Sequence, residues 1–371
     1  MRKTFLYVLV STFLFSSMEI TLKLAGSVFN PIQLNFIRFL IGGLVLLPLA
    51  IRALHTKQLK ITAKALGSFA LTGLLCVIVS MTLYQLAVVY GKASIVAVLF
   101  SSNPVFALIF SYVILHEKLS RTSLISVVIS TIGLLVIINP FHLSNVIAMA
   151  LGIASAVTFG FYSIISRKVS QAQHFDGVTM TCFTFLMGSL ELGLLMGISH
   201  LPMMGRLLGN SPLAQSFVNI PYFAGISSQT ILMILYIGIG VTGAGFATYF
   251  MAMERSDVST ASLVFFIKPA LAPLMALAIL KEAIVWNTWA GILVILIGST
   301  ISFLGQRSAE KRSAMEKTRY LATVENEGAA ADETLAQRRA QNKAQLEAKK
   351  EVLEGNLQER RQARNTVHSQ N

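Results

Sequence analysis

Residues 73–133 read GLLCVIVSMTLYQLAVVYGKASIVAVLFSSNPVFALIFSYVILHEKLSRTSLISVVISTIG, and this stretch occurs twice in the chain. When it is moved forward by 165 positions without a gap, twelve of its 61 residues meet an identical residue. The identical pairs include residue types that an apolar composition alone does not align: Tyr84 with Tyr249, Pro104 with Pro269, and Glu117 with Glu282. We interpret the match as an internal duplication.

The composition places the chain among membrane proteins. Of 371 residues, 54% are hydrophobic and 13% are charged, and the mean hydropathy is +0.67. Residues 1–305 hold seven acidic residues, whereas residues 306–371 hold ten, so two kinds of polypeptide meet near residue 305. Much of the net charge of +13 comes from lysines and arginines between apolar runs, where they mark loops. The charge therefore does not indicate a nucleic-acid partner.

The apolar runs predict an all-α integral membrane protein. A bilayer core needs about 20 mostly apolar residues per helix, and ten runs qualify: 4–24, 33–51, 65–88, 93–115, 121–139, 145–166, 177–198, 229–252, 258–280 and 285–305. The first run could instead be a secretory signal, but no small-x-small cleavage site follows it, and Glu19 and Lys23 continue its helical pattern. We expect five helices in residues 1–140, five in residues 141–305, and a charged cytoplasmic tail, partly helical or disordered, in residues 306–371.

Basic residues in the short loops predict the orientation. With the N-terminus inside, eleven lysines and arginines lie on the cytoplasmic side and three on the outer side. After ten crossings both termini are cytoplasmic, in the cytoplasmic (inner) membrane. Because five is an odd number, the two repeats enter the membrane from opposite sides and are inverted. Inverted repeats around a central cavity are a recurring plan of secondary transporters. On this topology, Glu282 caps the ninth helix at the outer face, and residues 200–229 form a flexible outer loop.

Polar residues inside the runs are the candidate site, because they are costly in a bilayer and usually face a cavity or a partner. Glu19 and Lys23 share a polar face of the first helix, and Tyr162 lies on a similar face of the sixth. Glu19 and Lys23 are spaced to pair with each other, although Lys23 could instead extend to the interface. Glu191 is a further possible proton carrier.

Two cations lie deeper in the membrane. Arg38 is five residues into the second run, where it either braces helices through backbone carbonyls or recognises an anion. Lys268 is near the midplane, and we expect it to face the cavity, with a structural pair to a carboxylate such as Glu191 as the alternative.

Pro104 and Pro269 are candidate helix hinges, because proline leaves the carbonyl groups of Phe100 and Phe265 without their helix partners. Asn103 and Lys268, directly before the two prolines, differ between the repeats. The repeated Tyr84 and Tyr249 either stack on a substrate or pack with a hydrogen-bonded hydroxyl group.

The chain shows no enzyme signature, phosphate-binding loop or metal-ligand spacing, so we expect no catalytic residue, metal or cofactor. Cys76 and Cys182 lie in apolar runs and are expected to be core residues.

The duplicated segments also carry a family resemblance. LYQLAVVYGKASIVAVLFSSNPVFALIFSYVILHEKLS (83–120) and TYFMAMERSDVSTASLVFFIKPALAPLMALAILKEAI (248–284) resemble the two copies of the signature of EamA-type transporters in the drug/metabolite transporter superfamily. Lys23 and Arg38 also match family positions. The resemblance implies ten helices in two inverted repeats, a central cavity, and export or exchange of small metabolites. Glu19 and Lys268 are not part of the family pattern.

We therefore expect a secondary active transporter that moves a small polar metabolite by alternating access. Three basic groups against one acid favour an amino acid or an organic anion. Proton coupling through Glu19 and a homodimer are further hypotheses. The alternative is a non-transporting membrane sensor or scaffold that acts through residues 306–371.

Overall fold

The structure is a computed structural model that describes residues 2–116, 121–138, 145–208, 211–255, 258–301 and 303–305, with short stretches between 308 and 350. Within these residues it contains helices and no strands. The chain divides into two compact units, Met1–Gln306 and Arg307–Asn371. In the second unit the longest described helical stretch is 340–347, and most of the expected tail helix lies outside the described residues.

Eight helical segments are long and apolar enough to cross a membrane: Phe5–Ala25, Pro31–Thr56, Ala63–Tyr90, Ala93–Leu115, Val146–Gln173, Gly177–Ile198, Ile231–Met253 and Trp286–Gly305. Two shorter apolar helices, Leu124–Ile137 and Ile267–Ile279, fall in the other two predicted runs. The prediction of a helical membrane protein is thus supported, while the count of ten crossings stays a prediction.

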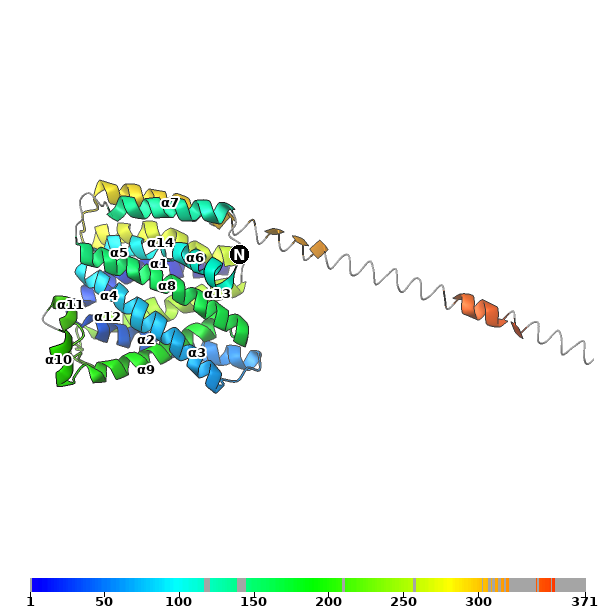
Figure 1. The fold of residues 1–371 in the computed structure, drawn as a ribbon, viewed down its shortest axis with the longest axis horizontal. Coiled ribbons are helices and arrows are strands. Elements are labelled where there is room, and N and C mark those ends of the chain that lie inside the picture. Colours follow the sequence, from blue (N-terminus) through cyan, green and yellow to red (C-terminus); the bar gives the residue numbers. More distant parts are fainter. Residues whose placement is uncertain are drawn as a thin grey trace, which may run out of the picture. The chain divides into compact units, whose positions relative to one another are not determined.

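The segments carry the labels of Figure 1. The first half comprises α1 (Arg2–Ala25), α2 (Pro31–Thr56), α3 (Ala63–Gly73), η1 (Leu74–Ser80), α4 (Met81–Tyr90), α5 (Ala93–Phe100), α6 (Asn103–Leu115) and α7 (Arg121–Ile138). The second half comprises α8 (Val146–Gln173), α9 (Gly177–Ile198), α10 (Pro202–Leu208), α11 (Pro212–Gln215), α12 (Ile231–Leu235), η2 (Tyr236–Ala244), α13 (Gly245–Arg255) and α14 (Val258–Ile279). The helix Trp286–Gly305 follows.

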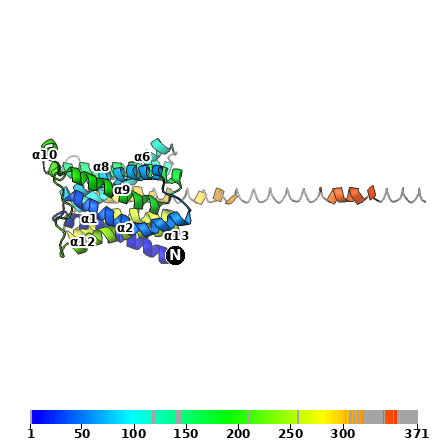
Figure 2. The same cartoon turned by 90° about the horizontal axis from the view of Figure 1, so that it is seen from below.

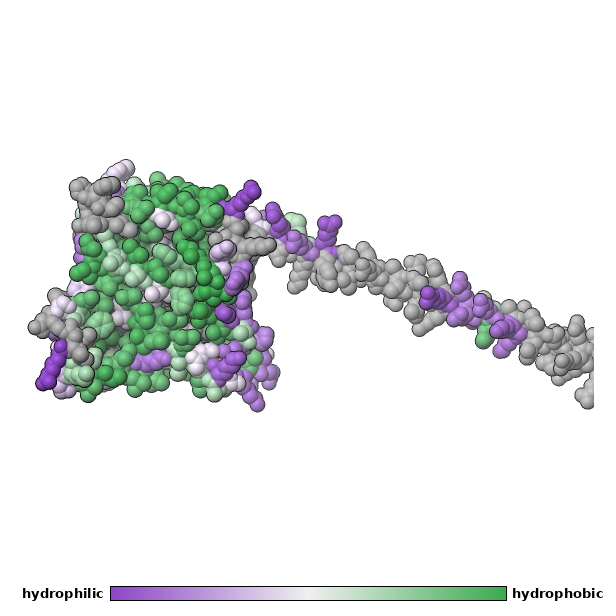
Figure 3. All heavy atoms as spheres, viewed as in Figure 1, coloured by the Kyte–Doolittle hydropathy of each residue, from purple (hydrophilic) through white to green (hydrophobic). Residues whose placement is uncertain are grey.

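The long helices lie roughly side by side in one bundle, with α10 at the end opposite to the start of α1 (Figures 1 and 2). We name the two ends of the bundle after basic residues. The Lys23 end holds the C-terminal end of α1, and the Arg52 end holds the C-terminal end of α2. Hydrophobic side chains cover the visible flank of the bundle, and hydrophilic ones gather near its ends (Figure 3). Such a belt is the surface that a multi-pass membrane protein presents to lipid.

α1 and α8 run in opposite directions. Lys23, near the end of α1, donates hydrogen bonds to the carbonyl oxygens of Val89 and Gly91 at 2.7 Å each. Asn145, directly before α8, donates to the carbonyl oxygen of Tyr90. The end of α1 and the start of α8 therefore lie at the same end of the bundle.

Each half contains one π-helical segment. Shifted by the repeat offset of 165, η1 (Leu74–Ser80) falls on residues 239–245, which overlap η2 (Tyr236–Ala244). Both segments are contact points between the halves. A Cβ atom at Gly73, directly before η1, would lie 2.5 Å from the backbone nitrogen of Gly188 in α9, and one at Gly243 in η2 would lie 2.6 Å from Val45 in α2. Glycine is needed at these positions because the helices approach so closely.

The connection after α9 is more ordered than the flexible loop we predicted. It contains the short helices α10 and α11. Gln33 donates to the carbonyl oxygens of Tyr222 at 3.2 Å and Ala224 at 2.8 Å, and Ile220 is buried. Side chains of α2 thus satisfy backbone groups of this segment, which composition alone could not indicate.

Candidate functional site

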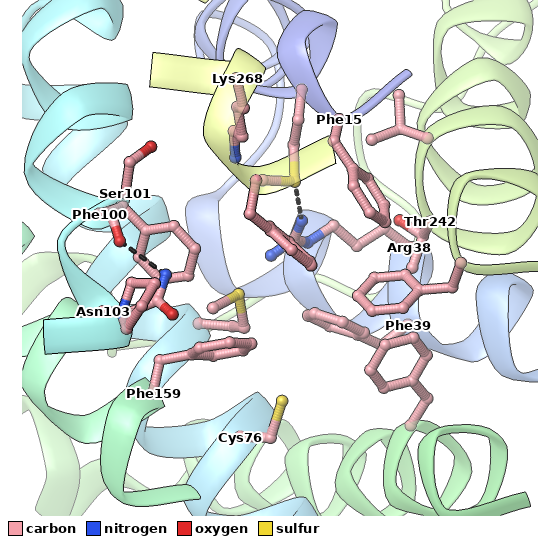
Figure 4. A pocket seen from close by; sticks show the side chains of 17 residues that line it. Phe15, Arg38, Phe39, Cys76, Phe100, Ser101, Asn103, Phe159, Thr242 and Lys268 are labelled. Atoms are coloured by element: carbon pink, nitrogen blue, oxygen red, sulfur yellow. Dashed lines mark hydrogen bonds between the residues drawn. The ribbon is translucent and has the colours of Figure 1, made fainter. Parts of the chain in front are cut away.

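A cavity of about 70 Å³ lies among the helices of the bundle. Seventeen residues from both halves of the chain line it: Phe15, Met18, Arg38, Phe39, Cys76, Met81, Phe100, Ser101, Asn103, Pro104, Phe159, Phe185, Val241, Thr242, Phe246, Phe265 and Lys268. Seven of them are phenylalanines, and the two cations are Arg38 and Lys268. In Figure 4 the polar groups of these cations reach toward a space framed by aromatic rings. We refer to this space as the central cavity.

An interrupted helix forms one wall of the central cavity. α5 ends at Phe100, Ser101 and Ser102 form a turn, and α6 begins at Asn103 with Pro104 in its first turn. The side-chain amide of Asn103 donates to the carbonyl oxygen of Phe100 at 2.8 Å, which satisfies the backbone group that lacks its helix partner. The predicted bend at Pro104 is therefore a break between two helices, whereas α14 continues through Pro269 and Pro273.

Lys268 is held by a carboxylate from α1. Its Nζ atom lies 2.8 Å from Oε1 of Glu19, and the Tyr84 hydroxyl group donates to the same oxygen. The exposed fractions are 4% for Lys268, 1% for Glu19 and 0% for Tyr84, so this is an ion pair shielded from solvent. Both expectations for Lys268 are partly met: it lines the cavity, and it also has a carboxylate partner, which is Glu19 rather than Glu191. Oε2 of Glu19 accepts no hydrogen bond from the described residues.

Arg38 is held by neighbouring side chains, and its role in anion recognition stays a prediction. Its Nε atom donates to Oδ1 of Asn35 at 3.0 Å, and Asn35 in turn donates to the carbonyl oxygen of Val77 at 3.0 Å. The Nη1 atom contacts the sulfur of Met18 at 3.5 Å, and the guanidinium carbon lies 4.3 Å from the ring centre of Phe39. Nη2 donates to none of the described residues, although Arg38 is only 2% exposed. One edge of the guanidinium group is thus fixed, while Nη2 on the other edge has no acceptor among the described residues.

Lys23 does not join this cluster. Its ammonium group donates hydrogen bonds to the carbonyl groups of Val89 and Gly91, and Glu19 forms an ion pair with Lys268 instead. The suggested Glu19–Lys23 pair is therefore not formed. Helical spacing permits that pair, but the backbone carbonyls at the end of α4 offer Lys23 two well-placed acceptors.

Contacts between the halves join the helices at the Lys23 end of the bundle. Glu282 accepts hydrogen bonds from the backbone nitrogens of Ala93 at 2.8 Å and Ser94 at 3.0 Å, and from the Ser94 hydroxyl group at 2.7 Å. It therefore caps α5, and our expectation that it caps its own helix was wrong. An anion is favourable at a helix N-terminus because the free N–H groups point at it. Beside this cap, Ile20 and Ala276 pack together with Ala93 in a buried apolar cluster. The equivalent Glu117 lies outside the described residues.

A second cavity, of about 430 Å³, extends toward the Arg52 end. It shares four lining residues with the central cavity, namely Cys76, Phe159, Phe185 and Phe246. Tyr162 and Tyr249 line this second cavity, together with Arg167 and Ser170 near the end of α8. The Tyr162 hydroxyl group faces Ser166 and Thr184. These two tyrosines therefore lie beside the space that leads away from the centre.

The structure brings together most of the predicted site. Arg38, Asn103 and Lys268 line the central cavity, Glu19 binds Lys268, and Tyr84 donates to Glu19. The sequence did not reveal the phenylalanine wall, because phenylalanine is equally expected on lipid-facing surfaces. The repeated Phe100 and Phe265 were the available signal. Among the described residues, no group of three or more His, Cys, Asp or Glu side chains is placed to hold a metal ion.

The fold and the site together indicate the class of protein. Apolar helices that can span a bilayer surround a cavity with polar groups at membrane depth, as in membrane transporters. The chain belongs to the EamA-like transporter family, which matches residues 2–139 and 146–304.

Similar proteins agree with this assignment. An uncharacterized transporter of Clostridium kluyveri is 34% identical over 327 residues, which cover 86% of this chain and 98% of that protein. An uncharacterized transporter of Archaeoglobus fulgidus is 25% identical, covering 72% and 87%. One solved crystal structure, 19% identical, aligns with a TM-score of 0.54 over 82% of this chain and 98% of its own, which shows similarity of fold.

Proposed function

We propose that this protein is a secondary active transporter that moves a small organic anion or amino acid across the cytoplasmic membrane by alternating access, without enzymatic activity. The observation that carries the proposal is the central cavity, where Arg38 and Lys268 lie buried between the two halves of the chain. Buried cations are expensive in a membrane, and positions facing a cavity are where transporters keep them.

Two features support inverted repeats. α1 and α8, the first helices of the two halves, run in opposite directions. Two halves of five membrane-spanning helices each require this arrangement, because five is an odd number. The π-helical segments η1 and η2 occupy equivalent places in the duplicated sequence, and each packs against a helix of the other half. We propose two domains, residues 1–140 and 141–305, related by an axis in the membrane plane.

The two ends of the bundle support alternating access. The Lys23 end is closed by the Glu282 cap and the cluster of Ile20, Ala93 and Ala276. Toward the Arg52 end, the 430 Å³ cavity leads away from the centre. If the basic Arg52 end is cytoplasmic, as the loop charges predict, this is a conformation closed to the outside. Transport then requires the contacts at the Lys23 end to break while equivalent contacts form at the Arg52 end.

The contacts of Lys268 support proton coupling as part of this proposal. Glu19 and a bound anion would compete for the same ammonium group, since Lys268 lines the cavity and binds Oε1 of Glu19. A proton on Glu19 would weaken the ion pair and release Lys268 to the anion. Among the described residues, Tyr84 and Arg38 also interact with Glu19.

Efflux from proteoliposomes tests the proposed function. Full-length protein is reconstituted into liposomes loaded with a mixture of amino acids, organic acids and sugars, and the released solutes are identified by mass spectrometry. The proposal expects at least one anion or amino acid to leave faster than from protein-free liposomes, and an imposed pH gradient to change its rate. If every solute leaves at the protein-free rate, the protein is not a transporter of these metabolites. If Glu19→Gln keeps the pH response, the coupling through Glu19 fails.

A further inference from the structure

We propose that the cargo of the central cavity is a monocarboxylate with an aromatic body, and that an ammonium group on the cargo is not recognised. The proposal rests on the transport function proposed above and names its substrate class. Three independent features of the cavity carry it: the unpartnered Nη2 atom of Arg38, the absence of an acid from the described residues of the lining, and the composition of the walls.

Arg38 has the form of a carboxylate receptor. The Asn35 side chain fixes Nε, and Phe39 lies under the guanidinium plane, so the group is oriented before a ligand arrives. Among the described residues, the buried Nη2 atom has no acceptor, and Nη1 donates to the weak acceptor Met18. A carboxylate offers two coplanar oxygens to such a planar edge, and a buried charge-assisted bond of this kind is among the strongest polar contacts.

The residues that line the cavity disfavour a cargo that carries an ammonium group in addition to its carboxylate. None of the described residues that line the cavity is Asp or Glu. Glu19, which binds Lys268, is not among the described lining residues; its Oε1 atom is engaged by Lys268 and Tyr84, and its Oε2 atom accepts no hydrogen bond from the described residues. An ammonium group in the cavity would therefore lose its water beside two cations of the lining, Arg38 and Lys268, which is unfavourable.

The walls favour an aromatic body and a single charge. Neighbouring rings are in contact around the cavity: the ring centres of Phe39 and Phe185 are 4.7 Å apart, and those of Phe100 and Phe159 are 5.1 Å apart. An aromatic ligand can add to such a cluster by edge-to-face or offset contacts. A dianion such as a phosphate monoester would place a second charge against apolar walls, where desolvation is costly. Phe159 and Phe185 line both cavities, so the aromatic surface continues into the 430 Å³ cavity. That cavity offers space for the aromatic part of the cargo.

Ligand binding by the purified full-length protein tests the proposal. The probes are 3-phenylpropionate, phenylalanine, phenethylamine, succinate and phenyl phosphate, which vary the charge and the body separately. Binding of each is measured from the concentration dependence of the melting temperature, because a ligand that binds the folded state raises it. We expect 3-phenylpropionate to bind at least about tenfold more tightly than each of the other four, a factor that corresponds to one charge-assisted contact.

Variants of Arg38 test whether 3-phenylpropionate binds in the central cavity. Arg38→Gln and Arg38→Lys are both expected to weaken 3-phenylpropionate binding by about tenfold or more, since lysine keeps the charge and loses the planar edge. Arg206→Gln, an exposed position in α10, is the matched control and should bind normally. Gel filtration and the melting temperature without ligand show whether each variant is folded, and the comparison of probes on the unmodified protein needs no variant.

Several outcomes overturn the proposal: equal or tighter binding of phenylalanine, phenethylamine, succinate or phenyl phosphate, no binding of 3-phenylpropionate, or wild-type binding by Arg38→Lys. The efflux experiment keeps the two proposals apart. If sugars or zwitterions leave the proteoliposomes rapidly, the protein is a transporter and only the substrate class is wrong. If no solute leaves faster than from protein-free liposomes, the transport function itself fails.

Discussion

The ammonium group of Lys268 in α14 lies 2.8 Å from the carboxylate of Glu19 in α1, and both side chains are almost completely buried. This ion pair joins the first helix of one half to a helix of the other. The Tyr84 hydroxyl group binds the same carboxylate oxygen, so three helices meet at one atom. The pair neutralises a buried charge, and at the same time it holds one of the two cations that line the cavity.

The ion pair predicts a strong asymmetry between single and double variants. Lys268→Met leaves the Glu19 carboxylate buried without its cation, which costs about 3–5 kcal/mol. We expect the melting temperature to fall by roughly 5 °C or more. In the double variant Glu19→Gln/Lys268→Met both charges are gone, and most of the loss should be recovered. A double variant no more stable than Lys268→Met would show that the pair does not form.

The Glu282 cap predicts how the Lys23 end opens. Glu282→Ala removes three hydrogen bonds to Ala93 and Ser94, each charge-assisted and worth about 1.5–3 kcal/mol in such settings. The buried Ala276 should then become reachable, so a cysteine placed there should react with a maleimide at least several times faster. Asp176→Ala is the control, because Asp176 also caps a helix, α9, at the Arg52 end. Equal labelling in the two variants would contradict the role of Glu282 in closure.

Two glycines of α3 predict opposite responses to the same substitution. A Cβ atom at Gly73 would lie 2.5 Å from a backbone atom of Gly188, whereas one at Gly67 meets nothing within 4 Å. Gly73→Ala must push α3 away from α9 and should destabilise the protein by about 1–3 kcal/mol. Gly67→Ala should be neutral or stabilise it by up to about 1 kcal/mol, because alanine favours a helix. Melting temperatures of the purified variants measure both, and equal losses would argue against the close packing of α3 on α9.

The tail predicts a result that separates transport from a scaffold function. Residues Met1–Gln306 form a compact unit by themselves. Truncation after Gln306 should therefore leave the melting temperature and solute efflux close to those of the full chain. Loss of efflux with an unchanged melting temperature would instead assign the tail a direct role in function.

Patterns along the sequence were sufficient to predict some features of the structure and not others. The apolar runs predicted the membrane-spanning segments, and the cost of burying charge singled out Arg38 and Lys268, which both line the central cavity in the structure. The partners of these charges could not be predicted, because they come from helices distant in the sequence. Lys23 is bound by the end of α4, and Glu282 caps α5 of the other half. Spacing along one helix cannot reveal which backbone groups another helix leaves free.

The break at Ser101 shows a similar limit. Proline predicts an interrupted helix in both halves, yet α14 continues through Pro269. In the first half Asn103 satisfies the freed carbonyl oxygen of Phe100 and begins α6. The equivalent position in the second half is Lys268, which instead extends to Glu19. The different neighbours of the two prolines thus lead to different local structures.

Efflux of loaded solutes from proteoliposomes, compared between the unmodified protein and Arg38→Gln at equal reconstituted amounts, tests the central claim most directly. If the cavity between the halves is the transport site, an anionic solute will leave faster than from protein-free liposomes, and Arg38→Gln will slow it by about tenfold or more. Efflux at the same rate from both proteins would contradict the assignment of the central cavity, and no efflux above the protein-free rate would contradict transport of these solutes.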